Sequence, residues 1–169
     1  MKKLNNFNLC PVPREQRPFY EYINQKKSIL LSWVKLNENG YTTNFFFTLF
    51  VIFTFSFSLI NLFVSFSYYP VESIVLSFVF SLIIESLLYL NFFLGWTYIG
   101  RRLVQDKVVY EESGWYDGKI WIKPIIILRH ERLLYHYQLI PLINRIKKTL
   151  QLILLSIVIL VCTFFLFLY

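Results

Sequence analysis

Three long apolar stretches divide the chain into polar and apolar parts. The first lies between Glu38 and Glu72 and contains no charged residue. The second contains a single charge, Glu85, and the third, near the C-terminus, contains none. A helix of about 20 apolar residues is long enough to cross the hydrocarbon core of a bilayer. The pattern therefore predicts an α-helical integral membrane protein with three transmembrane helices, at about 45–67, 73–97 and 149–168.

Glu85 does not prevent insertion of the second stretch. The Leu, Ile, Phe and Val residues around it favour insertion by roughly 4.5–9 kcal/mol in total, whereas a carboxylate near the centre costs about 3 kcal/mol. An ionisable side chain inside a span is by default a proton or cation site. No basic residue lies in any predicted span to pair with Glu85. Because transport normally needs more than three helices to enclose a path, we favour a structural hydrogen bond from Glu85 to Thr54 or to a partner subunit.

All 17 Lys and Arg residues lie on one side of this predicted arrangement, seven in residues 1–44 and ten in residues 100–149. The positive-inside rule then puts both basic segments on the cytoplasm-equivalent face of the membrane. The chain divides into a polar N-terminal segment with an interfacial helix (1–44), a transmembrane helical hairpin (45–98), a polar loop with a β-hairpin and a helix (99–148), and a C-terminal transmembrane helix (149–169).

Polar residues recur at helical spacing along both helices of the predicted hairpin. In an antiparallel hairpin, the residue numbers of two residues at equal depth add up to a constant sum. The polar residues of the two helices can be paired so that this sum stays nearly constant. Four contacts follow: Thr54 with Glu85, Ser58 with Ser81, Asn61 with Ser77, and Ser65 with Ser73. Hydrogen bonds of this kind between membrane helices contribute about 0.6 kcal/mol each. The alternative is that each hydroxyl bonds to a carbonyl of its own helix.

The polar segments also contain elements of their own. Residues 20–36 have the pattern of an amphipathic interfacial helix. Short β-branched and aromatic runs at 107–110 and 119–123 flank turn residues and predict a small β-hairpin. Pro124 is expected to open a helix that continues to about residue 139, and Pro141 is expected to interrupt it before the last span.

The charge and the motifs exclude several classes of function. A net charge of +7 is explained by topology, and five acidic residues alternate with the ten basic residues of the loop, which disfavours nucleic acid and favours membrane lipids as partners. His130-Glu131 lacks the second histidine four residues later that a zinc protease needs. Cys10 and Cys162 form no metal or disulfide framework. The sequence supports no enzyme and leaves any cofactor unknown.

Several blocks of the sequence resemble one family. They are Cys10–Pro18 with Glu21-Tyr22, Leu94–Ile99 with Arg101-Arg102-Leu103, Tyr110–Gly118 with Trp121, Lys123 and Pro124, and then Arg132-Leu133, Tyr137-Gln138 and Pro141. Together they resemble the hypothetical chloroplast reading frame thirty-six proteins, which are related to the proteins named as conserved in the green lineage and diatoms. His130-Glu131 departs from the Arg-Asp that is usual there. The resemblance implies a multi-pass plastid membrane protein in the thylakoid or inner envelope, with its N-terminus in the stroma, and carries no assigned reaction.

We therefore expect a non-enzymatic accessory or assembly factor whose partners are membrane lipids and other plastid membrane proteins. Polar and aromatic turn segments on a rigid anchor are common recognition sites. The predicted stromal recognition surface consists of Cys10, Pro11, Pro13, Glu15, Tyr110, Glu111, Glu112, Gly114, Trp115, Tyr116, Asp117 and Gly118. One alternative is that these blocks only fold together to cap the helices. The alternative function is an ion- or metal-handling transport component with Glu85 as its intramembrane site.

Overall fold

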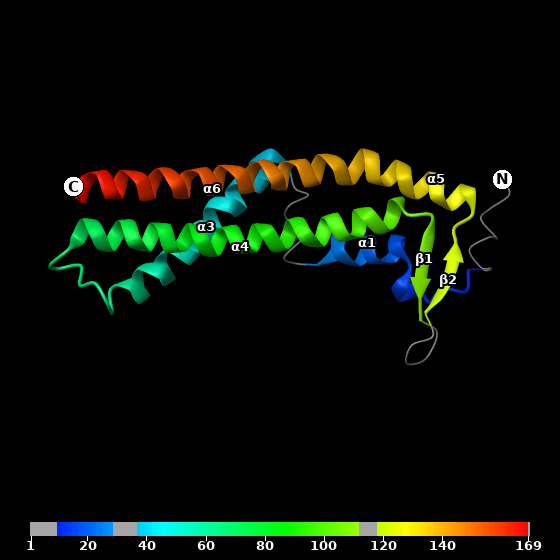
Figure 1. The fold of residues 1–169 in the computed structure, drawn as a ribbon, viewed down its shortest axis with the longest axis horizontal. Helices are drawn as coiled ribbons and strands as arrows, with labels where there is room; N and C mark the ends of the chain where they lie inside the picture. Colours follow the sequence, from blue (N-terminus) through cyan, green and yellow to red (C-terminus); the bar gives the residue numbers. More distant parts are fainter. Residues whose placement is uncertain (1–9, 29–36, 112–117, 169) are drawn as a thin grey trace.

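The computed structural model describes residues 10–28, 37–111 and 118–168. Long helices form an extended bundle, and a two-stranded sheet lies at one end of it (Figure 1). The elements, in chain order, are η2 (Arg14–Gln16), α1 (Pro18–Lys27), α3 (Glu38–Ile60), α4 (Pro70–Val104), β1 (Lys107–Tyr110), β2 (Lys119–Ile122), α5 (Ile125–Leu134), η4 (Tyr135–Leu139) and α6 (Ile140–Leu168).

Helix α4 is the centre of the bundle. It packs against α3 and α6, and it also contacts α1, α5 and η4 (Figure 1). Helix α6 runs along α4 for much of its length, whereas α3 begins beside α6 and ends on the other side of α4. Helix α4 is correspondingly the most buried of the long helices in the part of the chain that the structure describes.

Three helices are long and apolar enough to cross a membrane, as the sequence predicted. Helix α3 nevertheless begins and ends about seven residues earlier than expected. At its start, the hydroxyls of Thr42 and Thr43 donate to main-chain oxygens of Glu38 and Asn39, so these polar residues fit the first turns of the helix. After Ile60 the chain turns repeatedly until Pro70 opens α4 at a position where its missing N–H is not needed.

The third helix is longer than expected, because Pro141 does not interrupt it. Helical structure continues from α5 through η4 into α6. The five residues of η4, which ends two residues before Pro141, form a π-helical turn. A proline lacks an N–H donor and crowds the carbonyl four residues before it, and a wider π turn relieves that crowding without ending the helix.

The predicted β-hairpin is present. Strands β1 and β2 pair antiparallel, with Lys107 opposite Ile122 and Tyr110 opposite Lys119. Two strands alone are of marginal stability in water, so the hairpin requires a packing partner, which is described below.

Helix α1 corresponds only to the first part of the helix expected at residues 20–36, of which residues 29–36 lie outside the described structure. It lies lengthwise beside α4, so its axis follows the bundle and does not cross it (Figure 1). The reason is that its apolar face packs on protein. The ring of Tyr22 contacts the edge of Trp96 at a centroid distance of 6.2 Å, and its hydroxyl donates to Gln138 Oε1.

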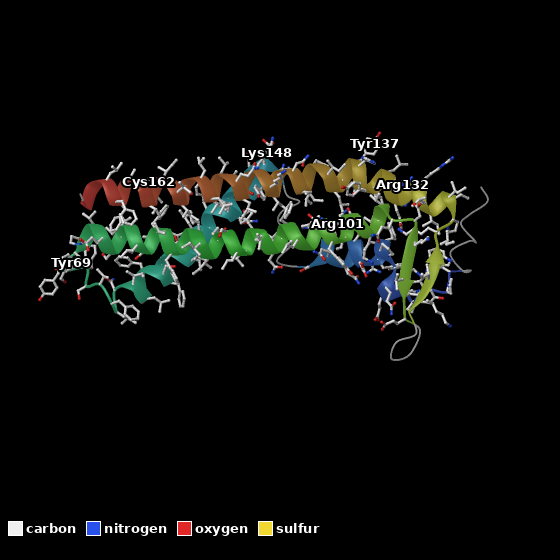
Figure 2. The ribbon with its side chains drawn as sticks, viewed as in Figure 1. Tyr69, Arg101, Arg132, Tyr137, Lys148 and Cys162 are labelled. Atoms are coloured by element: carbon white, nitrogen blue, oxygen red, sulfur yellow. The ribbon has the colours of Figure 1, made fainter. Side chains whose placement is uncertain are left out.

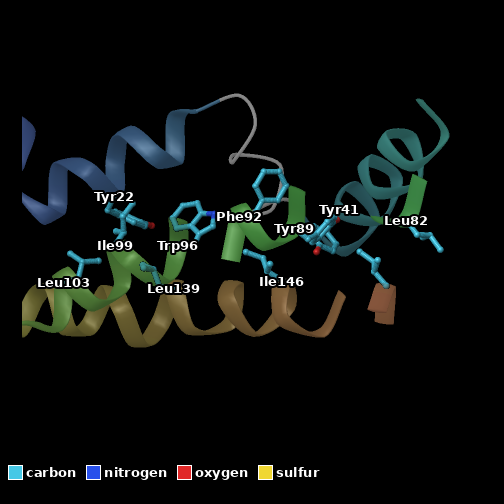
Figure 3. Close-up of a cluster of buried hydrophobic side chains, with 11 residues drawn as sticks. Tyr22, Tyr41, Leu82, Tyr89, Phe92, Trp96, Ile99, Leu103, Leu139 and Ile146 are labelled. Carbon is cyan, nitrogen blue, oxygen red and sulfur yellow. The ribbon is translucent and has the colours of Figure 1, made fainter. Parts of the chain in front are cut away.

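The main hydrophobic core follows α4 (Figure 3). One part lies where α3, α4 and α6 meet and includes Tyr41, Tyr89 and Ile153. The other part lies toward the sheet, where Trp96, Ile99 and Leu103 are covered by α1, η4 and α6. One face of the second half of α4 is therefore apolar because it is buried in protein, which hydropathy alone does not distinguish from burial in lipid.

Candidate functional site

The N-terminal segment 10–17 packs against the hairpin, and we call these parts together the head (residues 10–17, β1 and β2). The side-chain amide of Gln16 bonds both main-chain groups of Glu111: its Nε2 donates to the carbonyl at 3.0 Å and its Oε1 accepts from the N–H at 2.9 Å. The Arg17 guanidinium donates to the carbonyls of Val12 at 2.8 Å and Cys10 at 3.2 Å. These bonds hold an irregular segment against the edge of β1.

An apolar cluster lies between the segment and the sheet. Val12 is buried against Val108 and Tyr110, and Cys10 and Trp121 pack around them. The head therefore has a small core of its own, and residues 10–17 supply the cover that an isolated hairpin lacks.

Lys123 joins the head to the helices. Its ammonium group donates to the carbonyls of Arg102 at 2.8 Å and Leu103 at 3.2 Å, and to Glu131 Oε2 at 2.6 Å. The side chains of Lys123 and Glu131 are 0% and 5% exposed. The last carbonyls of a helix lack partners within the helix and attract cations. Lys123 thus caps α4 and fixes α5 beside it.

Arg102 makes the second connection. Its guanidinium is paired with the Glu21 carboxylate of α1 and donates to the carbonyl of Gln16 at 3.0 Å. It also lies over the ring of Tyr98, 5.7 Å from the centroid. The sequence analysis did not assign a structural role to Lys123 or Arg102. For Lys123 the available signal was a lysine within the apolar run of residues 120–128.

Seven residues of the predicted recognition surface lie in the described structure, in or beside the head. Pro11, Glu15, Glu111 and Gly118 are exposed, and Cys10 and Pro13 are half-buried. Tyr110 is buried in the head core and is a packing residue in this structure. The other five, Glu112, Gly114, Trp115, Tyr116 and Asp117, lie outside the described residues. Whether the exposed residues recognise a partner stays a prediction.

The predicted polar stripes are placed differently on the two helices. On α4, Ser73, Ser77, Ser81 and Glu85 are all fully buried. On the α3 side, Thr54, Ser58 and Ser65 are exposed, and Asn61 is half-buried just after the helix end. The three serines of α4 donate to carbonyls of their own helix, as in the stated alternative.

The partner of Glu85 also differs from the prediction. Thr48, and not Thr54, donates to Glu85 Oε1 at 2.9 Å, and Phe53 packs on Phe78 at a centroid distance of 5.8 Å. The contact register is shifted by about six to eight residues. The physical reason is that α3 ends at Ile60 and the link to α4 is a series of turns, so the two helices do not form the tight hairpin that the constant sum assumed.

A polar contact between helices lies one turn from Glu85, on the side toward the head. The hydroxyls of Tyr41 on α3 and Thr149 on α6 are 2.8 Å apart. The Tyr41 ring contacts the ring of Tyr89 on α4 at a centroid distance of 6.4 Å. The Arg145 guanidinium lies over the Tyr41 ring, 5.2 Å from its centroid. This layer joins all three long helices and puts Tyr89 level with Thr149. Within the described residues, no group of three His, Cys, Asp or Glu side chains is placed to hold a metal ion.

Comparison with known proteins identifies the family. Residues 10–152 match the family model described as CGLD27-like, conserved in the green lineage and diatoms 27. The chain is 40% identical over 157 residues to the uncharacterized protein ycf36 of Pyropia yezoensis, covering 88% of this chain and 90% of that protein. It is 41% identical over 149 residues to ycf36 of Porphyra purpurea, covering 85% and 87%.

A relative in land plants is longer. The protein conserved in the green lineage and diatoms 27, chloroplastic, of Arabidopsis thaliana is 36% identical over 144 residues, which are 82% of this chain and 43% of that protein. No solved structure matches the chain. The family match covers most of the chain, including the head, α4 and the first part of α6, and agrees with the resemblance stated from the sequence. The chain belongs to the CGLD27-like family.

Proposed function

We propose that this protein is a non-enzymatic, membrane-anchored accessory or assembly factor for a plastid membrane complex, and that its head binds a subunit of that complex. The observation that supports this most is the way the head is fixed to α4 by Lys123 and Arg102. A preorganised surface loses less conformational entropy on binding than a flexible one. The exposed side chains of Pro11, Glu15 and Glu111 lie on this fixed surface.

A plastid location is supported by the name of the Arabidopsis relative, which is described as chloroplastic. We infer that the head faces the stroma, because the described basic residues extend from Lys148 and Arg101 toward the head, while Tyr69 lies in the turn at the opposite end (Figure 2). Basic segments are retained on the side of synthesis. The membrane is the thylakoid or the inner envelope.

The proposal is tested by charge reversal on the head. Glu15→Lys and Glu111→Lys change exposed side chains that lie outside the head core. The tagged protein is isolated from plastid membranes in mild detergent, and the subunits isolated with it are quantified by mass spectrometry. We expect each variant to lose most of a defined set of membrane-complex subunits. Like-charge juxtaposition and lost complementarity weaken a docking surface in this way.

Glu38→Lys is the matched control, because Glu38 is also exposed but lies at the start of α3, away from the head. It should retain the same subunits as the unchanged protein. The proposal fails if all three variants retain an identical set, or if the unchanged protein is isolated only with copies of itself.

A second candidate function is ion handling at Glu85. It is supported by the full burial of Glu85 and by its Oε2, which has no hydrogen-bond partner among the described residues. An intramembrane carboxylate with a free oxygen is suited to bind a proton or a cation. Glu85→Gln distinguishes the two functions. If plastid ion content changes while the isolated subunits stay the same, ion handling is the better description; if both are unchanged, Glu85 has only a structural role.

A further inference from the structure

A groove of about 480 Å³ lies where the end of α4 meets β1. Its lining includes Tyr98, Arg101 and Arg102 of α4, Gln105 just after that helix, Lys107 of β1, and Glu111 just after β1. Three of these side chains are basic and one is acidic, so the groove carries a net positive charge. A positively charged concave surface with amide and hydroxyl donors is suited to bind an anionic group.

Two of the three basic groups are available for a ligand. The guanidinium of Arg102 is already engaged by Glu21 and by the carbonyl of Gln16. Arg101 and Lys107 are exposed, and their side chains make no hydrogen bond or ion pair with any residue in the described ranges. Figure 2 shows Arg101 on α4 close to the head. The groove therefore contains two cations that form no ion pair with a described residue.

An exposed apolar strip on α4 leads into this groove. Leu87, Leu90, Leu94 and Tyr98 are 61%, 45%, 57% and 59% exposed. Their spacing of three, four and four residues puts them on one narrow face of the helix. Arg101 follows three residues after Tyr98 on the same face, so the strip ends at the basic groove.

The strip on α4 continues toward the head past the level at which the neighbouring helix α6 becomes basic. Tyr41 contacts both Tyr89 of α4 and Thr149 of α6, so these two residues lie at the same level of the bundle. On α6, Thr149 directly follows the lysine pair Lys147-Lys148. On α4 the first basic residue is Arg101, twelve residues after Tyr89, which is about 18 Å along a helix. Apolar side chains between these two levels need an apolar cover, and the described parts of this chain do not provide one.

We propose that the groove and the strip together form a binding site for an anionic glycerolipid. The phosphate or sulfonate of the headgroup is bound by Arg101 and Lys107, with Gln105 as a further donor, and one acyl chain lies along Tyr98, Leu94 and Leu90. The strip from Leu87 to Tyr98 is about 16 Å long, close to the thickness of one leaflet of the hydrocarbon core. A soluble anion would use the groove and leave the strip bare, so a lipid accounts for both features.

The site is tested with the purified full-length protein. The protein is stripped of endogenous lipid in detergent and offered phosphatidylglycerol or phosphatidylcholine with the same acyl chains, and bound lipid is measured by native mass spectrometry. We expect one phosphatidylglycerol to be retained with at least about tenfold preference, because two charge-assisted contacts distinguish the headgroups. Arg101→Gln with Lys107→Gln should remove that preference, and Leu94→Asn should weaken retention of the lipid.

Lys147→Gln with Lys148→Gln removes the same charge from exposed positions on α6 and is the matched control. It should keep the preference for phosphatidylglycerol. The proposal is overturned if this control loses the preference equally, since the effect is then a general attraction of charge. It is also overturned if glycerol 3-phosphate displaces the lipid completely at equal concentration, or if a cysteine at Leu94 crosslinks to another protein in plastid membranes and not to a lipid probe.

Discussion

At the scale of single residues, the structure depends on charged groups that lie inside it. Lys123 places its ammonium group among two carbonyls of α4 and the carboxylate of Glu131. We expect Lys123→Met to lower the free energy of unfolding by about 3–5 kcal/mol, because removing one partner leaves a buried charge without compensation. Thermal unfolding of the purified protein in detergent measures the loss.

Two further variants show whether the broken Lys123–Glu131 ion pair is the cause of the lost stability. Lys27→Met removes a lysine that is exposed at the end of α1 and should change the unfolding midpoint little. Glu131→Leu in the Lys123→Met background should recover part of the stability, since no unpaired charge is then buried. A double variant that is less stable than Lys123→Met alone would contradict this explanation.

Two glycines of α4 test how closely this helix packs against its neighbours. A Cβ at Gly100 would lie 2.8 Å from Cε2 of the Tyr135 ring, whereas a Cβ at Gly95 would meet the flexible end of Gln25 at 2.8 Å. We expect Gly100→Ala to destabilise the protein by about 1–3 kcal/mol. Gly95→Ala should be neutral or stabilising, because Gln25 can move and alanine favours a helix by up to about 1 kcal/mol.

Thermal unfolding of the two variants side by side gives the comparison, and each is the other's control for the change in helix propensity. Equal midpoints for Gly95→Ala and Gly100→Ala would show that the Tyr135 ring is free to move. The contact between η4 and α4 would then not depend on the glycine.

At the scale of elements, the sequence was sufficient where a pattern reports directly on local structure. Apolar runs predicted three helices able to span a membrane, and turn residues between β-branched runs predicted the hairpin. The helix ends and the α3–α4 register were not predictable in this way, because they depend on how the link after Ile60 folds. Lys123 could not be assigned for a similar reason: its partners come from α4 and α5, and a pattern within one segment does not show them.

The register itself leads to a prediction. In a chain with Cys10→Ser and Cys162→Ser, the pair Phe53→Cys and Phe78→Cys should crosslink efficiently with a short bifunctional thiol reagent, because these rings are in contact. The pair Ser58→Cys and Ser81→Cys should not, because Ser58 is exposed while Ser81 is buried. Gel mobility after reaction measures both pairs, and efficient crosslinking of only the second pair would restore the constant-sum register.

At the scale of the whole molecule, the distribution of charge along the bundle predicts a topology. The head and the Arg101–Lys107 region lie at one end, and the turn containing Tyr69 lies at the other (Figure 2). Moving the basic end across the membrane would require translocation of many charges, which the positive-inside rule disfavours. In a cysteine-free chain, we expect Lys107→Cys to react with a membrane-impermeant maleimide in sealed thylakoids or envelope vesicles that expose their stromal face.

Tyr69→Cys should react with the same reagent only after the vesicles are opened, because the turn then faces the opposite compartment. The head, the lipid groove and the exposed surface around Glu15 all lie on the Lys107 side of the bundle. Labelling of both cysteines in sealed vesicles would mean that the helices do not cross the bilayer as a bundle. A stromal docking surface would then lose its physical basis, whereas the fold of the head and its attachment through Lys123 would be unaffected.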